Sequence, residues 1–340
     1  QELPNYGVFD EKRYFTSGDE SFVFECQQTK VGVLICEDQW VDGPIDRLCQ
    51  SNVDVVVSLN ASPFQIDKQN QRIDICKHYA LKFDLLFIYV NMVGGQDEVV
   101  FDGNSFVISN LGELTLQLPA FKEISSLHIS SDYLPSILSE EESIYSALVL
   151  ATRDYIQKNS FGGALIGLSG GIDSALTLAV AADAIGPENV HAVMMPYQFT
   201  SEMSLEDSEL QARTQGVQFS NIDIHSMVDS FNFSLNDFFE NTSPDSTEEN
   251  IQARVRGTLL MALSNKYHKI VLATGNKSEM AVGYATLYGD MCGGFAPLKD
   301  IPKTMVYRLS SYRNTVSPVI PERVITRPPS AELAPNQVDQ

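Results

Sequence analysis

The stretch Leu168-Ser169-Gly170-Gly171-Ile172-Asp173-Ser174 decides how the second half of this chain folds. It follows the apolar run Ala164–Gly167 and precedes residues 175–182, in which apolar residues recur with helical spacing. The two glycines therefore lie at a turn from a buried strand into a helix, where they let the backbone bend tightly and approach a ligand. The hydroxyls of Ser169 and Ser174 and the free N–H groups at the helix start form a cradle for phosphate oxygens.

The same stretch contains Asp173, an unusual neighbour for phosphate groups unless Mg²⁺ bridges the two. The alternative is an ordinary glycine turn capped by Ser and Asp. The turn is not a Walker-type loop, because no Gly-Lys-Ser/Thr follows. It resembles the Ser-Gly-Gly-x-Asp-Ser loop of the ATP pyrophosphatases, a family that cleaves ATP between the α and β phosphates and forms an adenylated intermediate. The resemblance implies ATP and Mg²⁺ as cofactors, with Asp173 as a metal ligand and eight ATP-binding residues: Gly167, Leu168, Ser169, Gly170, Gly171, Ile172, Asp173 and Ser174.

Length and composition bound the class of protein. The chain has 340 residues, enough for two domains, and a formal net charge of −21, which argues against a nucleic-acid-binding surface. We see no apolar run long enough to span a membrane and no secretory signal, so we expect no membrane partner. The five cysteines show neither Cys-x-x-Cys nor zinc spacing, which favours reduced thiols and a cytoplasmic location.

The first 120 residues predict an α/β domain. Buried-type strands are expected over residues 29–36, 53–59 and 85–90, with a single helix over 67–83. That helix should carry Arg72, Lys77 and Lys82 on its solvent-exposed face. Buried strands with helices outside them imply a layered sheet.

Cys36 follows the first of these strands, where a thiol beside backbone N–H groups is a candidate nucleophile. A buried cysteine that packs as a small apolar residue is the commoner case. The surrounding segments favour the nucleophile, because they resemble the nitrilase, or carbon–nitrogen hydrolase, family, and in particular the glutaminase half of the glutamine-dependent NAD⁺ synthetases. The matching segments are residues 3–11, 36–40 (Cys-Glu-Asp-Gln-Trp), 60–64 (Asn-Ala-Ser-Pro-Phe) and 91–97.

This resemblance implies an α-β-β-α sandwich over residues 1–120 that is incomplete at its start. In the family, a Glu, a Lys and a Cys hydrolyse the glutamine amide. Cys36 matches the nucleophile, and the Glu37 N–H would help to hold the oxyanion. Tyr6, Glu37, Ser62 and Lys68 match positions that contact glutamine. The family's Lys and Glu lie upstream of the position where this sequence starts, so we expect a preceding segment; the alternative is an inactive glutaminase half.

A connector is expected over residues 121–140, followed by a second domain over 141–340 that opens with a helix over 140–157. Further strands are expected over 190–195, 218–224 and 269–274, alternating with helices. This pattern predicts a Rossmann-like adenine-nucleotide α-hydrolase fold with a parallel sheet. Ligands then bind at the carboxyl ends of the strands.

Three later segments, residues 200–207, 249–257 and 273–290, resemble the synthetase half of the same family. We expect a helix to start at Glu249. The resemblance implies that Thr274 contacts ATP, that Asn250 and Glu279 contact deamido-NAD⁺, and that Glu279 also reaches Mg²⁺. Lys299 and Lys303 are weaker candidates for phosphate contacts. A further substrate-binding Lys in the family lies beyond the end of this sequence.

The implied reaction converts deamido-NAD⁺, ATP and ammonia into NAD⁺, AMP and pyrophosphate, with ammonia released from glutamine at Cys36. Family members form homo-oligomers, so we expect one here, with small molecules as the other partners. Two alternatives stay open: an ammonia-dependent synthetase with an inactive glutaminase half, or another pyrophosphate-loop adenylating amidotransferase. An enzyme that activates a tRNA base should show a basic surface or a Cys pair, and a binding protein without catalysis should have lost Ser169, Asp173, Ser174 or Glu279.

Overall fold

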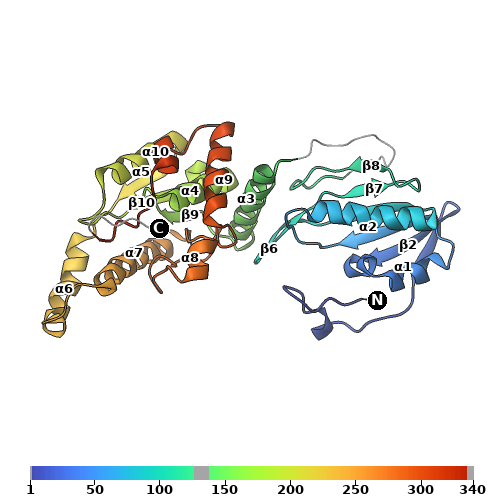
Figure 1. Ribbon diagram of the computed structural model, residues 1–340, viewed down its shortest axis with the longest axis horizontal. Helices are drawn as coiled ribbons and strands as arrows, with labels where there is room; N and C mark the ends of the chain where they lie inside the picture. The colour runs from blue at the N-terminus through green and yellow to red at the C-terminus, as the bar shows by residue number, and fades with distance from the viewer. Residues whose placement is uncertain (1, 126–137, 335–340) are drawn as a thin grey trace. The chain divides into compact units, whose positions relative to one another are not determined.

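The computed structural model describes residues 2–125 and 138–334 (Figure 1). The chain divides into two compact units, Gln1–Glu140 and Glu141–Gln340. Most of the expected connector over residues 121–140 lies outside the described residues. Among the described residues, no helix is both long and apolar enough to cross a bilayer.

The first unit is built on a mixed six-stranded sheet with the order β1-β2-β3-β4-β7-β8. The three central strands β2, β3 and β4 run parallel, while β1, β7 and β8 pair antiparallel at the two edges. The short strands β5 and β6 form a separate antiparallel ribbon. The strands span β1 (Phe22–Cys26), β2 (Thr29–Ile35), β3 (Val55–Asn60), β4 (Leu86–Asn91), β5 (Val93–Gln96), β6 (Val99–Asp102), β7 (Phe106–Ile108) and β8 (Leu114–Gln117).

Helices α1 (Asp42–Cys49) and α2 (Lys68–Phe83) pack on one face of this sheet, around a core that includes Leu34, Val56 and Phe87. The strand ends leave Ile35 and Leu59 exposed. The expectation of a single helix is wrong, because α1 is a second one. Its helical pattern is only eight residues long and contains Gly43 and Pro44, yet proline is well tolerated in the first turn. Two 3-10 turns, η1 (Glu11–Arg13) and η2 (Cys36–Trp40), complete the unit.

Arg72 does not lie on the exposed face of α2, as the sequence had suggested. It is fully buried and forms an ion pair with Asp102, which is also buried, at 2.9 Å. Lys82 is exposed as expected and pairs with Asp46. The helical periodicity gave the wrong exposure for Arg72. A charged side chain can be buried when another element supplies its partner, and a helical wheel does not show such a partner.

The second unit contains a four-stranded sheet in which every strand pair is parallel, with the order β11-β10-β9-β12. The strands are β9 (Ala164–Gly167), β10 (Val190–Met194), β11 (Gln218–Asn221) and β12 (Ile270–Leu272). Side chains alternate across the sheet, so Ile166 packs in one core and Leu165 in the other. The α/β class with a parallel sheet is confirmed.

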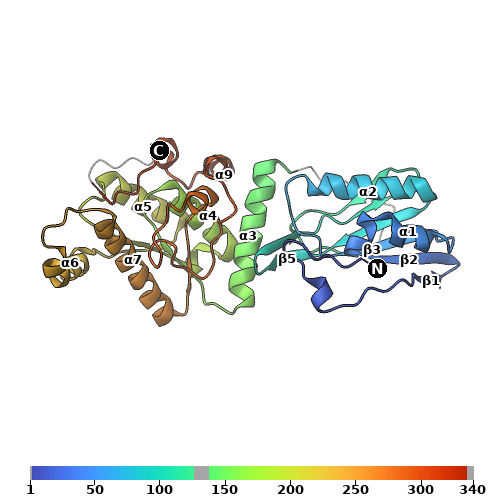
Figure 2. The same cartoon turned by 60° about the horizontal axis from the view of Figure 1, so that its bottom comes forward.

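Helices cover both faces of this sheet (Figures 1 and 2). One core includes Ile156 of α3 and Leu178 of α4, and the other includes Val228 of α6 and Val255 of α7. The helix expected from Glu249 starts earlier, at Ser246, because Asp245 and Glu248 form a capping box. The helical elements are α3 (Glu140–Lys158), α4 (Ile172–Ile185), η3 (Pro187–Asn189), α5 (Glu202–Gln215), α6 (His225–Phe239), α7 (Ser246–Tyr267), α8 (Lys277–Val282), α9 (Lys303–Val316) and α10 (Glu322–Thr326).

Candidate active sites

The glycine-rich loop joins the carboxyl end of β9 to the start of α4, as its sequence predicts. Ser169 and Ser174 tie the loop together, with 3.1 Å between their hydroxyl oxygens, and the Ser174 hydroxyl accepts the Ser169 N–H at 3.2 Å. The Gly171 N–H donates to the Ser169 hydroxyl at 3.2 Å. These bonds fix a compact turn at the positive end of the α4 dipole, which is a favourable place for an anion.

Gly170 adopts a φ of +80°, which L side chains rarely adopt. A Cβ atom at this position would lie 2.7 Å from the Ser204 carbonyl oxygen at the start of α5. The Gly170 carbonyl accepts a hydrogen bond from Arg327. Glycine is therefore required here both by backbone conformation and by space.

A cavity of about 510 Å³ opens beside this loop, within the second unit. It lies at the carboxyl ends of β9, β10 and β12, where ligands bind in open parallel sheets. Of the expected nucleotide-site residues, Gly170, Asn250 and Lys299 are absent from its lining. The expected residues that line it are Gly167, Leu168, Ser169, Gly171, Ile172, Asp173, Ser174, Thr274, Glu279 and Lys303.

Two carboxylates and one lysine meet at the cavity wall. Lys303 forms an ion pair with Asp173, and its Nζ lies 3.7 Å from a Glu279 oxygen. Burial lowers the pKa of Lys303, but the attraction of Asp173 and Glu279 outweighs it, so the net shift is upward. Burial and the nearby Asp173 raise the pKa of Glu279. Lys303 thus balances charge that two neighbouring carboxylates would otherwise concentrate.

Asn276 connects the two carboxylates and was not identified from the sequence. It is fully buried and caps α8 by accepting the Glu279 N–H at 3.0 Å. Its side-chain amide donates to Asp173 at 2.8 Å, while its backbone N–H donates to a Glu279 oxygen at 3.1 Å. The capping box Asn276-x-x-Glu279 is visible in the sequence, but the contact with Asp173 is not.

Asp173 and Glu279 are the carboxylates that this cavity offers to Mg²⁺. Among residues 2–125 and 138–334, no cluster of three or more His, Cys, Asp or Glu side chains is arranged to hold a metal. Asp173 and Glu279 supply two carboxylates on the cavity wall. Mg²⁺ is commonly held by one or two carboxylates together with substrate phosphates and water, so the pair fits a metal that arrives with a nucleotide.

The remaining candidates are more dispersed. Asn250 accepts a hydrogen bond from the Thr286 hydroxyl at 2.7 Å and lies outside the cavity lining. Lys299 pairs with the adjacent Asp300 and does not line the cavity either. A residue missed from the sequence, Arg256, does line it and donates to the Met195 carbonyl at 3.0 Å. Burial lowers the pKa of Arg256 to about 10, so it stays cationic at neutral pH and suits an anionic ligand.

Cys36 lies in the first unit, at the turn from β2 into η2. Its φ of +43° is uncommon for a non-glycine residue and marks a sharply bent backbone. Burial raises the pKa of its thiol, and the charges of Glu37 and Asp38 add to this shift. A hydrogen bond from the Ala61 backbone and the charge of Arg72 act in the opposite direction. Burial therefore opposes ionisation of the thiol, so a base that accepts its proton would make it a better nucleophile.

The side chains expected to bind glutamine gather around Cys36. The Tyr6 hydroxyl donates to the Glu37 carboxylate at 2.9 Å, and burial followed by this bond raises the pKa of Tyr6 to about 12. The Lys68 ammonium lies 4.1 Å from the centre of the Trp40 ring, a cation–π contact. Burial and the charge of Arg72 lower the pKa of Lys68. The Glu37 carboxylate and the Lys68 ammonium thus lie near the thiol. This pair of opposite charges is complementary to a zwitterionic amino acid.

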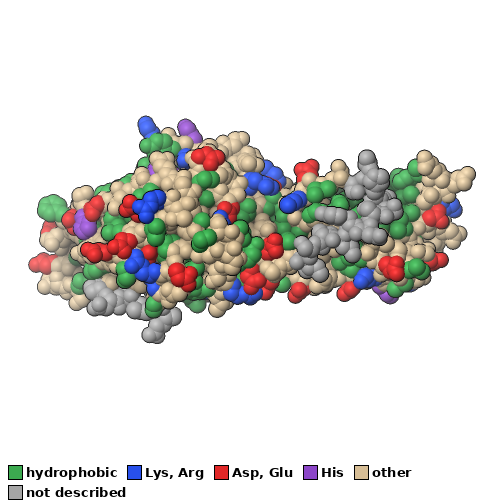
Figure 3. Space-filling view, turned by 90° about the horizontal axis from the view of Figure 1, so that it is seen from above, with side chains coloured by type: hydrophobic (Ala, Val, Ile, Leu, Met, Phe, Trp, Pro, Cys, Tyr) green, Lys and Arg blue, Asp and Glu red, His purple; other side chains and the backbone are tan. Residues whose placement is uncertain are grey.

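Side chains of both charges lie on the surface of the molecule. Figure 3 shows one face, in which acidic and basic side chains are interspersed among neutral ones.

The parallel sheet with a glycine loop at its carboxyl edge defines a Rossmann-like nucleotide-binding unit, joined in one chain to a nitrilase-like unit. Two family models match accordingly: "Carbon-nitrogen hydrolase" over residues 2–137 and "NAD synthase" over residues 144–340. The chain belongs to the NAD synthase family.

Named relatives agree with this assignment. A glutamine-dependent NAD(+) synthetase from Acinetobacter baylyi is 55% identical over 349 residues, which cover 99% of this chain and 64% of the relative. The solved structure of the glutamine-dependent NAD+ synthetase from Acinetobacter baumannii in complex with ADP is 53% identical, with a TM-score of 0.92. That match covers 98% of this chain and 65% of the solved chain. The chain thus spans just under two thirds of the length of these relatives.

Proposed function

We propose that this chain amidates deamido-NAD⁺ to NAD⁺ with ATP, releasing AMP and pyrophosphate, and that the ammonia comes from glutamine hydrolysed at Cys36. The observation that carries the proposal is the Ser169–Ser174 loop, which borders a cavity whose wall bears Asp173, Glu279 and Lys303. The match of residues 144–340 to the NAD synthase family and the glutamine-dependent relatives support it.

The loop binds the phosphates of ATP through the hydroxyls of Ser169 and Ser174 and the N–H groups at the start of α4. The substrate carboxylate attacks the α-phosphorus, and pyrophosphate leaves toward the loop. The product of this step is an acyl-adenylate, from which ammonia displaces AMP. Negative charge develops on phosphate oxygens during both steps, so the positioned N–H groups and Lys303 stabilise the transition states.

The remaining roles in this half follow the family resemblance. Thr274 contacts ATP, whereas Asn250 and Glu279 contact deamido-NAD⁺. Mg²⁺, held by Asp173 and Glu279 with phosphate oxygens, would neutralise phosphate charge when bound.

In the first unit, the Cys36 thiolate attacks the glutamine carboxamide, ammonia leaves, and water hydrolyses the thioester. The Glu37 N–H holds the oxyanion. Glu37 and Tyr6 bind the α-ammonium side of glutamine and Lys68 binds its α-carboxylate, with Ser62 as a further contact. This division rests on charge complementarity, because Glu37 and Lys68 flank the thiol with opposite charges.

We further propose a cytoplasmic homo-oligomer that binds no nucleic acid. The five cysteines are all free, which agrees with a reducing compartment. The net charge of −21 opposes binding to a phosphate backbone.

ATP carrying isotopic labels in its α and γ phosphates tests the reaction when it is supplied with Mg²⁺, deamido-NAD⁺ and either ammonia or glutamine. We expect labelled AMP and labelled pyrophosphate in equal amounts, together with NAD⁺. Release of ADP and orthophosphate would contradict the adenylation chemistry. NAD⁺ formed from ammonia but not from glutamine would instead indicate an ammonia-dependent synthetase with an inactive glutaminase half.

A further inference from the structure

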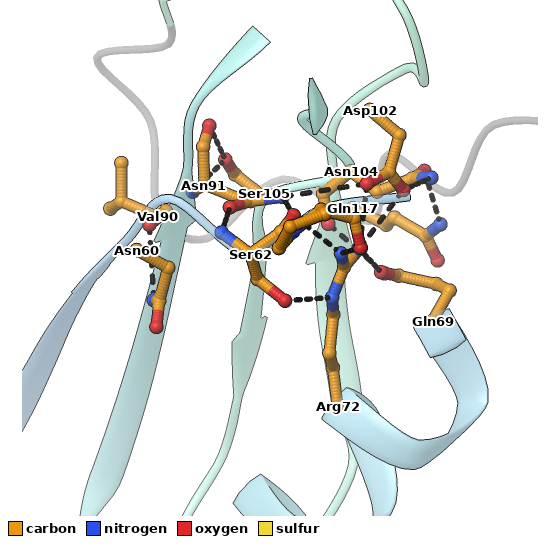
Figure 4. A network of polar contacts seen from close by, with 11 residues as sticks. Asn60, Ser62, Gln69, Arg72, Val90, Asn91, Asp102, Asn104, Ser105 and Gln117 are labelled. Atoms are coloured by element: carbon orange, nitrogen blue, oxygen red, sulfur yellow. Dashed lines mark hydrogen bonds and ion pairs between the residues drawn. The ribbon is translucent and has the colours of Figure 1, made fainter. Parts of the chain in front are cut away.

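A buried arginine, Arg72, lies against the loop that contains Ser62 (Figure 4). Each nitrogen of the Arg72 guanidinium makes a hydrogen bond. Nη1 donates to both oxygens of Asp102 at 2.9 Å. Nη2 donates to the carbonyls of Ser62 at 2.8 Å and Pro63 at 3.0 Å, and Nε donates to the Ser62 hydroxyl at 3.2 Å. The planar fork of arginine therefore holds two consecutive backbone carbonyls at once.

The acid end of this cluster is itself held in place. Asp102, at the end of β6, accepts a hydrogen bond from the Asn104 side chain at 2.9 Å. Gln69, one turn before Arg72 on α2, accepts from Arg72 Nη1 at 3.3 Å and donates to the Asn104 carbonyl at 3.0 Å. These hydrogen bonds hold the Arg72 side chain to one set of partners and one rotamer.

The loop gripped by Arg72 connects β3 to α2 and is also held from the opposite side. The Ser62 N–H donates to the Asn91 side chain at 2.9 Å, and the Asn91 amide donates back to the Ser62 carbonyl at 3.2 Å. The residue before Ser62 is Ala61, which follows the end of β3. There Leu59 pairs with Ile35, the residue before Cys36. The Ala61 backbone also lowers the pKa of the Cys36 thiol, against the effect of burial. The guanidinium therefore holds the residue that directly follows Ala61, at the strand end next to the one that carries Cys36.

A contribution to the free energy of unfolding does not by itself explain why the Arg72–Asp102 pair is buried here. Removing an arginine and a carboxylate from water is costly, and well-packed apolar residues often replace such a pair without loss of stability. What apolar residues cannot do is hold the carbonyls of Ser62 and Pro63 in a set direction.

We propose that Arg72 is a positioning residue for Cys36: held by Asp102, it fixes the backbone of residues 61–63 beside the thiol, at the neighbouring strand end. The inference rests on the proposed role of Cys36 as the glutaminase nucleophile. It adds three buried residues, Arg72, Asp102 and Asn91, to those on which that site depends.

Thiol alkylation tests the proposal within one folded chain. The protein is treated with iodoacetamide over a range of pH, and the labelling of each cysteine is followed by peptide mass spectrometry. Cys36 reports the site, Cys26 is an exposed reference, and Cys76, fully buried on the same helix as Arg72, reports unfolding.

Two variants distinguish the positioning role of Arg72 from the effect of its charge. Arg72→Lys keeps the charge but loses the fork. The double variant Arg72→Met/Asp102→Asn removes both charges and so leaves neither buried without its partner. Lys82→Met is the matched control, because it removes a cation from the exposed side of α2.

We expect Cys36 labelling at pH 8 to slow about tenfold in Arg72→Lys and in the double variant, with its pH–rate profile moved to higher pH, since one pKa unit changes the thiolate fraction tenfold. Cys26 should label normally, Cys76 should stay protected, and Lys82→Met should match the parent. Unchanged Cys36 labelling in Arg72→Lys, with Cys76 protected, would overturn the proposal. If Arg72→Lys exposes Cys76, the double variant is examined instead. Unchanged Cys36 labelling in the double variant, with Cys76 protected, would then overturn the proposal.

Failure of the glutaminase role would look different. If Cys36→Ala retains glutamine-dependent NAD⁺ formation, the proposed function of Cys36 is wrong whatever the alkylation rates are. If Cys36→Ala loses that activity while alkylation is unaffected by Arg72→Lys, only the positioning role is wrong.

Discussion

The side-chain amide of Asn276 donates a hydrogen bond to the carboxylate of Asp173, 103 residues earlier in the chain, over 2.8 Å. The same asparagine caps α8 and so orients Glu279. One buried side chain therefore sets the relative position of both carboxylates proposed to hold Mg²⁺. Residues that orient metal ligands in this way commonly matter almost as much as the ligands themselves.

Asn276→Ala should lower AMP formation about 10- to 100-fold, because Asp173 and Glu279 lose their common anchor. It should also destabilise the second unit by about 1 kcal/mol through loss of a helix cap. Steady-state assays across Mg²⁺ concentrations and urea unfolding measure the two effects. Asp245→Ala is the matched control, since it removes the cap of α7 and leaves Asp173 untouched. Equal AMP formation in the two variants would show that the Asp173 contact is dispensable.

Asp173→Asn should reduce AMP formation by at least about a hundredfold, because the charge that pairs with Lys303 and is proposed to hold Mg²⁺ is lost from the site where phosphate charge develops. The fold should persist, since asparagine has nearly the same shape. Radiolabelled AMP and circular dichroism measure the two properties. Asp300→Asn removes an acid from another lysine pair, outside the cavity lining, and should retain activity. An active Asp173→Asn enzyme would remove Asp173 from the mechanism.

Gly170→Ala should distort the phosphate loop, because its φ of +80° is strained for alanine and the new Cβ would meet the Ser204 carbonyl. We expect a loss of about 1–3 kcal/mol in the free energy of unfolding, measured by urea titration, and weaker binding of ATP, the proposed ligand, measured by calorimetry.

Gly216→Ala separates strain from crowding. Its φ is +71°, but a Cβ there meets no atom within 4 Å. This control should lose stability through backbone strain and bind ATP as the parent does. Weaker ATP binding in both variants, or in neither, would rule out a specific effect at the loop.

Cys36→Ala should abolish NAD⁺ formation from glutamine and leave formation from ammonia within about twofold, because the proposed nucleophile acts only on glutamine. Parallel assays with each nitrogen source measure the ratio, and Cys26→Ala, which removes an exposed thiol from β1, serves as the control. A loss of ammonia-driven turnover in Cys36→Ala would mean that the two reactions are not assigned to separate sites.

The local patterns of this sequence were sufficient for the α/β class and for the parallel strands of both sheets, but not for the antiparallel strands β1, β7 and β8 at the edges of the first sheet. That information lies in neighbouring residues, because burial periodicity and glycine turns are local properties. Examples are the strand–turn–helix pattern around Ser169 and the apolar runs of β2, β3, β4 and β10. The position of the loop at the carboxyl edge follows from parallel topology. The roles assigned to individual site residues stay predictions.

Tertiary structure alone decided which charges are buried and which side chains meet. Arg72 reads as a solvent-exposed residue of α2 until Asp102 of β6 is placed against it, and Lys303 reads as an ordinary loop lysine until Asp173 and Glu279 surround it. Asn276 gives no signal beyond its helix cap. The physical reason is the same in each case: the energy of a buried polar group depends on partners that are distant in sequence, whereas a residue's own neighbours determine only its secondary structure.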